Sequence, residues 1–242
     1  MRQEKIHADG RELLSGALPE GKMLRDKPAK PGRKTVTVAA GAKKGPCFQF
    51  PGGTYLEFKL DDFNITDHAH FSMLFKTVAE EGVVLYAEGP DDYEAVFLSQ
   101  GKIHYLIANP SPSGVEGTSG GYYVSDAAVN NGTWLRLDLW RNWPRQRRLR
   151  GGGMENYTDT GMVLRDVAGG GEERHLDNIY HRGIEISSDI FIGGVRPTLT
   201  HVSGSTAPPS FEGMIKEMEE TRNERVLSLY YLNKNGLVKR CP

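Results

Sequence analysis

Alternation of apolar and polar residues with a period of two is the feature of this sequence that most constrains its fold. In TWLRLDLWRN (133–142) three leucines fall on one side of an extended chain, and tryptophans and charged residues fall on the other. HFSMLFKT (70–77) places two phenylalanines and a methionine on one side in the same way. Because successive side chains of a β-strand point to opposite faces of its sheet, both segments are predicted to be strands with one buried face.

Further segments with strand-like patterns follow along the chain, divided by Gly, Asn, Asp and Pro. They are 54–60, 82–88, 93–99, 102–108, 184–194, 210–220 and 226–232. The stretch that begins at Met214 can also be read as a helix, but its place among strands favours a strand. Many short strands divided by turn residues predict an antiparallel β-sandwich. Residues 143–161 and 165–183 are predicted to be long loops, the first with some hairpin character.

The composition is that of a globular protein, and the length suits one all-β domain or two smaller domains. The chain has 242 residues, of which 38% are hydrophobic, and a formal net charge of −1, so bulk charge indicates no particular partner. No apolar run approaches the roughly 20 residues that span a membrane, and no insertion into a membrane is expected. Residues 1–46 are basic and poor in large apolar side chains, which predicts a linker or tail, docked in part or free, before a domain at 47–242.

The two cysteines, Cys47 and Cys241, stand near the two ends of the predicted domain. They are either free thiols of a cytosolic protein or a disulfide that joins the ends of a secreted one, and their spacing alone does not decide between these. Sequons for N-glycosylation at Asn64, Asn131 and Asn156 give weak support to secretion.

The order of motifs across residues 47–242 resembles that of laminin G-like domains, most of all those of laminin α chains. The resemblance is carried by GVVLYAEGPDDYEAVFLSQGKIHYLI, VNNGTWLRLDLWRN, IFIGGVRP, SFEGMIKEMEETRNERVL and the closing GLVKRCP. It implies a curved, jelly-roll β-sandwich of the concanavalin A-like type, with no catalytic machinery. Met214 stands where the family usually has a cysteine, and this departure favours a bridge between Cys47 and Cys241.

The resemblance also implies a calcium site at one rim of the sandwich. Carried over residue by residue, the family's ligands fall on Asp92, the carbonyls of Asn109 and Gly183, and Glu185, where the family usually has Asp. Carboxylates and carbonyls are the oxygen ligands that calcium prefers. Without the resemblance, Asp91 and Asp92 are better explained as turn residues that follow Gly89 and Pro90.

A basic stretch, RNWPRQRRLR (141–150), begins at the end of the strand predicted at 133–142. Its arginines are Arg141, Arg145, Arg147, Arg148 and Arg150. The guanidinium group suits planar anions, so the stretch is a candidate for binding heparin or related sulfated glycans. The alternative is a solvated loop whose arginines pair with nearby acids. Nucleic acid is not expected as a partner because the resemblance points to an extracellular setting.

These features predict a non-enzymatic, secreted adhesion module of the extracellular matrix, such as a basement membrane, or of a cell-surface ectodomain. Its expected partners are cell-surface receptors or acidic glycans, and neighbouring modules of a longer chain. Two alternatives stay open. One is a carbohydrate-active jelly-roll enzyme, although the paired carboxylates of such enzymes are not evident in the sequence. The other is a structural spacer in a tandem array of modules.

Overall fold

The structure of the chain is a computed structural model. It describes residues 46–59, 65–66, 68–110, 120–142, 146–148, 154–156, 158–181, 184–199, 208–220, 225–226, 231–233 and 237–242.

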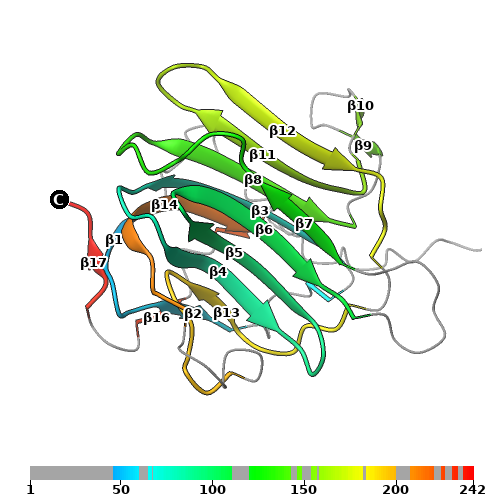
Figure 1. Ribbon diagram of the computed structural model, residues 1–242. Helices are drawn as coiled ribbons and strands as arrows, with labels where there is room; N and C mark the ends of the chain where they lie inside the picture. The colour runs from blue at the N-terminus through cyan, green and yellow to red at the C-terminus, as the bar shows by residue number, and fades with distance from the viewer. Residues whose placement is uncertain are drawn as a thin grey trace, which may run out of the picture. The chain divides into compact units, whose positions relative to one another are not determined.

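Two antiparallel sheets face one another across a single core (Figure 1). The first has the order β12-β11-β8-β3-β14-β1-β17, and β15 pairs with β14. Its strands are β1 (Cys47–Pro51), β3 (Ala69–Lys76), β8 (Leu135–Arg141), β11 (Thr160–Asp166), β12 (Glu172–Asp177), β14 (Glu212–Glu220), β15 (Arg225–Val226) and β17 (Lys239–Arg240).

The second sheet has the order β16-β2-β13-β4-β5-β6-β7. Its strands are β2 (Leu56–Phe58), β4 (Gly82–Glu88), β5 (Tyr93–Ser99), β6 (Lys102–Ala108), β7 (Gly121–Val124), β13 (Ile190–Ile192) and β16 (Tyr231–Asn233). A separate hairpin pairs β9 (Gln146–Arg148) with β10 (Met154–Asn156). This architecture confirms the predicted all-β, antiparallel sandwich.

The inner faces of the two sheets supply the core. The leucines of β8 and the aromatic residues of β3 pack with residues of β5 and β6, among them Val96 and Ile103. A second apolar layer lies outside the second sheet, where Val195 and Leu199 pack with Tyr86 and Phe191. Because this layer covers the outer face of β4, every residue of that strand is buried.

The prediction of a long loop over residues 165–183 was wrong. β11 extends to Asp166, and a short turn leads to β12, which pairs with β11 along its length. The turn is closed by the amide of Asp166, which donates to the carbonyl of Gly171 at 2.8 Å. β12 lies at the edge of its sheet and is only partly covered, so its sequence EERHLD lacks the apolar residues that mark a buried strand.

Two other sequence predictions are confirmed. The hairpin character of residues 143–161 corresponds to β9 and β10. The segment 210–220 is a strand and not a helix, although β14 has a shift in register between Lys216 and Glu219 and a positive φ of 52° at Glu217. These features indicate a β-bulge.

A disulfide joins Cys47 and Cys241, whose Cα atoms lie 5.3 Å apart. It links β1 to the segment after β17, and these two strands also pair with one another in the first sheet. The amide of Cys241 donates to the carbonyl of Cys47 at 3.0 Å. The bridge between the ends of the domain is therefore confirmed. Across the described ranges, no helix has the length and apolar character needed to cross a membrane.

Candidate functional site

The β5–β6 hairpin brings Asp92 and Asn109 to the same rim of the sandwich. The two strands pair with Tyr93 opposite Ala108, so the residues just beyond them face each other. The hairpin turns at Gln100 and Gly101, whose φ values of 52° and 74° suit a two-residue turn. The side chains of Asp92 and Asn109 are both buried.

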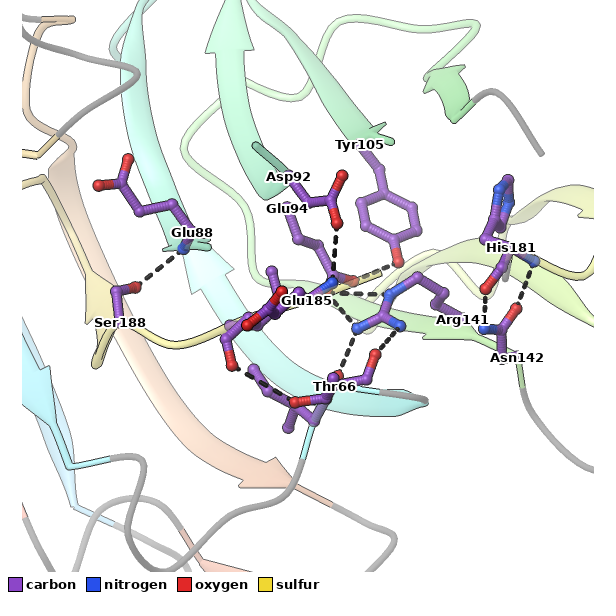
Figure 2. A network of polar contacts seen from close by, with 12 residues as sticks. Thr66, Glu88, Asp92, Glu94, Tyr105, Arg141, Asn142, His181, Glu185 and Ser188 are labelled. Carbon is purple, nitrogen blue, oxygen red and sulfur yellow. Dashed lines mark hydrogen bonds and ion pairs between the residues drawn. The ribbon is translucent and has the colours of Figure 1, made fainter. Parts of the chain in front are cut away.

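Asp92 is bonded to the segment that precedes β13. Its Oδ2 accepts a hydrogen bond from the amide of Glu185 at 2.8 Å (Figure 2). Gly89 allows this approach, because a Cβ at that position would lie only 1.7 Å from the carbonyl oxygen of Glu185. A residue with a side chain at position 89 would therefore push the segment away from Asp92.

Further hydrogen bonds fix the same segment to the end of β4. The amides of Ser187 and Ser188 donate to the carbonyl of Glu88 at 3.0 and 2.8 Å. In return, the amide of Glu88 donates to the Ser188 hydroxyl at 2.8 Å (Figure 2). The backbone around Glu185 is thus held in place on both sides of the contact with Asp92.

The structure brings together some of the predicted calcium ligands. Asp92, Asn109 and the backbone of Glu185 meet at the rim, whereas the Glu185 side chain is exposed to solvent. Gly183 lies outside the described residues. Among the described residues, no lysine, arginine or histidine pairs with the buried Asp92 carboxylate, which keeps one oxygen besides the one bonded to Glu185.

Arg141 is not a surface residue, and its predicted role in glycan binding is contradicted. Its side chain is fully buried and bonds to Glu94, with distances of 3.3 Å from Nε and 3.1 Å from Nη2 to Oε2. Position 141 continues the face of β8 that carries the buried leucines, so its side chain enters the sandwich. A guanidinium group without exposed surface cannot reach a sulfate or carboxylate in solution.

The Arg141 guanidinium also supports the rim. It donates to the carbonyls of Ile65 at 2.5 Å and Thr66 at 2.8 Å, and the Thr66 hydroxyl donates to the carbonyl of Ile186 at 3.3 Å (Figure 2). Ile186 follows Glu185 directly. A chain of polar contacts therefore runs from the buried ion pair to the segment that bonds Asp92.

Two further polar side chains accompany this ion pair inside the sandwich. The Tyr105 hydroxyl donates to the Glu94 carboxylate at 2.5 Å, and burial raises the pKa of this tyrosine well above its usual value. The backbone of His181 exchanges two hydrogen bonds with the Asn142 amide. Burial, followed by the charge of Arg141, lowers the pKa of His181.

The side chains of the other predicted glycan-binding arginines lie outside what the structure describes. Arg147 and Arg148 belong to β9, where only the backbone is described, and Arg145 and Arg150 lie outside the described residues. Their role stays a prediction.

Of the three sequons, only Asn131 has a described side chain. Asn131 is exposed, and its Oδ1 accepts hydrogen bonds from the amide and hydroxyl of Thr133 at 3.0 and 2.7 Å. Asn64 lies outside the described residues, and Asn156 is described only as backbone of β10.

A second group of possible metal ligands was missed in the sequence. Asp126, which follows β7, lies with Glu173 and His175 of β12, and their ligand atoms are all within 4.8 Å of one another. The Glu-x-His spacing in β12 puts two of these side chains on one face of a strand, a signal that the sequence did contain. The contribution of Asp126, which comes from the other sheet, depends on the fold.

The two facing sheets define an antiparallel β-sandwich. The family model for the laminin G domain matches residues 75–220, and the chain belongs to the laminin G domain family. Members of this family are binding modules and are in general not catalytic. No curated protein matches this sequence.

Two solved structures of laminin chains are similar to this one in fold. The LG1-3 region of the laminin α2 chain has a TM-score of 0.58 and 19% identity, with 81% of this chain and 34% of that chain covered. Domains LG4-5 of the mouse laminin α1 chain have a TM-score of 0.58 and 17% identity, with 89% of this chain and 52% of that chain covered. The chain therefore spans about a third and about half of these two structures.

Proposed function

We propose that residues 47–242 form a calcium-dependent, extracellular recognition module that binds acidic glycans or receptor proteins, preceded by a linker or tail at 1–46. The observation that carries this proposal is the buried Asp92 carboxylate at the rim, opposite Asn109 and bonded to the backbone of Glu185. Within the part of the chain that the structure describes, no cationic side chain pairs with this carboxylate, and a bound cation would offset the cost of burying its charge.

The residues at the rim fit calcium. Calcium takes six to eight oxygens from carboxylates, carbonyls and water, and it tolerates irregular geometry. Asp92 would provide a carboxylate, Asn109 and Gly183 would provide carbonyls, and the exposed Glu185 would complete the protein ligands. When bound, the ion supplies positive charge that a carboxylate or sulfate of a glycan can share. Gly89 and the hydrogen bonds around Glu88 keep the backbone near Asp92 before the ion arrives.

Two observations support an extracellular location. The Cys47–Cys241 disulfide is of a kind that persists in oxidising compartments. The exposed Asn131 is suitable for N-glycosylation. The arginines of residues 145–150 would add a salt-sensitive attraction to sulfated glycans, since exposed charges are screened by ions.

Calorimetric titration with calcium tests the rim site. The wild-type protein should bind one calcium ion at the rim, and Asp92→Ala should abolish that binding. Asp91→Ala is the matched control, because Asp91 is the exposed neighbour and should not be needed. Equal calcium binding by the wild type and Asp92→Ala would refute the assignment.

A further inference from the structure

A shallow groove of about 630 Å³ lies on the second sheet beside the Asp92 rim, and it shares Asn109 with the proposed calcium site. Leu106 and Ala108 of β6 form its floor, and Tyr93 of β5 and Tyr122 of β7 border it. The pairing of the strands fixes this arrangement, since Tyr93 lies opposite Ala108 and Leu106 lies opposite Tyr122. The two tyrosines belong to strands about 10 Å apart, which leaves room for a six-membered ring over β6.

Both tyrosines are held in position by neighbours. The Tyr122 hydroxyl bonds to Nδ1 of His104 at 2.6 Å, and the imidazole stacks on Phe97 with ring centroids 4.9 Å apart. Tyr93 stacks on Tyr86 with centroids 6.0 Å apart. Yet 57% of the Tyr122 surface remains exposed. An aromatic ring that is fixed and exposed is prepared to bind a ligand at a low cost in conformational entropy.

One border of the groove is backbone without a side chain, at Gly120. A Cβ at Gly120 would lie 1.8 Å from the carbonyl oxygen of Ile107, so the backbone approaches β6 closely at this point. A Cβ at Gly121 would instead lie 2.9 Å from the ring of Tyr123, which packs against the core.

One polar group at the border of the groove is an acceptor. Asp91 is exposed at its border, and a carboxylate accepts hydrogen bonds from hydroxyl groups. The negative faces of the tyrosine rings attract C–H groups that carry partial positive charge. A pyranose ring offers both features, with C–H bonds on its faces and hydroxyls around its edge. The charge of Asp91 disfavours an acidic sugar.

We propose that this groove binds a neutral pyranose unit of a glycan, stacked on Tyr122 or Tyr93, with its hydroxyls donating to Asp91. A proline-rich peptide also stacks on aromatic rings, but it presents mainly carbonyl acceptors because proline has no amide hydrogen. The groove offers such a peptide an acceptor at Asp91 and a tyrosine hydroxyl already bonded to His104. The sugar is therefore the better match. The proposed contacts of the sugar, with Tyr122, Tyr93 and Asp91, involve no calcium ion, so binding in the absence of calcium tests this proposal separately from the Asp92 site.

Saturation-transfer NMR in the presence of EDTA tests this proposal, with lactose, cellobiose and N,N′-diacetylchitobiose as separate probes and decaproline as the competing class. At least one disaccharide should bind saturably without calcium. Tyr122→Ala and Tyr93→Ala should each weaken that binding about three- to tenfold, as the loss of one aromatic contact predicts. Asp91→Asn should also weaken it, whereas Tyr122→Trp should retain it.

The matched control is Tyr180→Ala, since Tyr180 is another exposed tyrosine and follows β12. This variant should bind the sugar like the wild type. The proposal is overturned if none of the three disaccharides binds, if only decaproline binds, or if Tyr180→Ala weakens binding as much as Tyr122→Ala.

Discussion

Arg141 and Glu94 form an ion pair inside the sandwich, with Nη2 of the arginine 3.1 Å from the glutamate carboxylate and at most 1% of either side chain exposed. The pair belongs to β8 and β5, so it connects the two sheets. Its remaining hydrogen bonds go to the Tyr105 hydroxyl and to the carbonyls of Ile65 and Thr66. The polar network that supports the rim therefore starts from the core.

Arg141→Met should destabilise the protein by about 3–5 kcal/mol, because it leaves the Glu94 carboxylate buried without its cation. Urea unfolding of the purified variant measures this loss. Arg174→Met is the control, since Arg174 is half exposed, and its loss should cost less than about 1 kcal/mol. Similar stabilities for the two variants would show that the buried pair contributes no more than a surface pair.

Gly89→Ala should displace the backbone at Glu185, since the new Cβ would overlap the carbonyl oxygen. The expected cost is about 1–3 kcal/mol of stability, as for other overpacked sites, together with weaker calcium binding. Thermal unfolding and calcium titration measure the two effects. Gly171→Ala is the matched control, because a Cβ there meets nothing within 4 Å. If both glycine variants bind calcium like the wild type, Gly89 does not position the rim.

Loss of the disulfide should destabilise the domain strongly. The bridge closes a loop with a sequence separation of 194 residues, and the entropy of loop closure predicts a contribution of about 5 kcal/mol. The variant Cys47→Ser/Cys241→Ser should therefore unfold at much lower urea than the wild type. An unchanged midpoint would mean that the pairing of β1 with β17 suffices to hold the ends together.

The stability should fall as the pH drops below about 6.5, the usual pKa of histidine. Burial and the charge of Arg141 lower the pKa of His181 in the folded state. The unfolded chain therefore takes up a proton that the folded protein rejects, and stability is lost as pH falls from the unfolded pKa toward the folded one. Glu94 and Asp177, whose charges raise this pKa, oppose the effect only in part.

Urea unfolding between about pH 5 and 7.5 measures this dependence. One proton changes the free energy of unfolding by at most about 1.4 kcal/mol per pH unit. In His181→Leu this contribution should disappear. An identical slope in the variant and the wild type would assign the pH dependence to other groups.

Much of the fold could be predicted because apolar and polar residues alternate with a period of two in each strand that has only one face in the core. The limits predicted for 93–99 and 102–108 agree with β5 and β6. The edge strand β12 was missed, since it carries polar residues on both faces. In β14 the bulge places the buried residues Ile215 and Met218 three positions apart, a spacing that resembles a helix.

The sequence predicted the candidate site less completely. The register of β5 and β6 follows from their short turn, so the proximity of Asp92 and Asn109 could be predicted from the sequence. The burial of Arg141 could also have been predicted, because this residue continues the leucine face of β8. The group of Asp126, Glu173 and His175 could not be predicted from the sequence, since it depends on how the edges of two sheets approach each other.

We propose that calcium bound at Asp92 strengthens the binding of acidic glycans. The most direct test is surface plasmon resonance on immobilised heparin, with the wild type and Asp92→Ala each measured in calcium and in EDTA. We predict stronger binding of the wild type in calcium, and no such difference for Asp92→Ala. A variant with Arg145, Arg147 and Arg148 changed to Ala should lose the salt-sensitive binding that persists in EDTA. Wild-type binding that is equal in calcium and in EDTA would show that calcium at Asp92 plays no part in glycan binding.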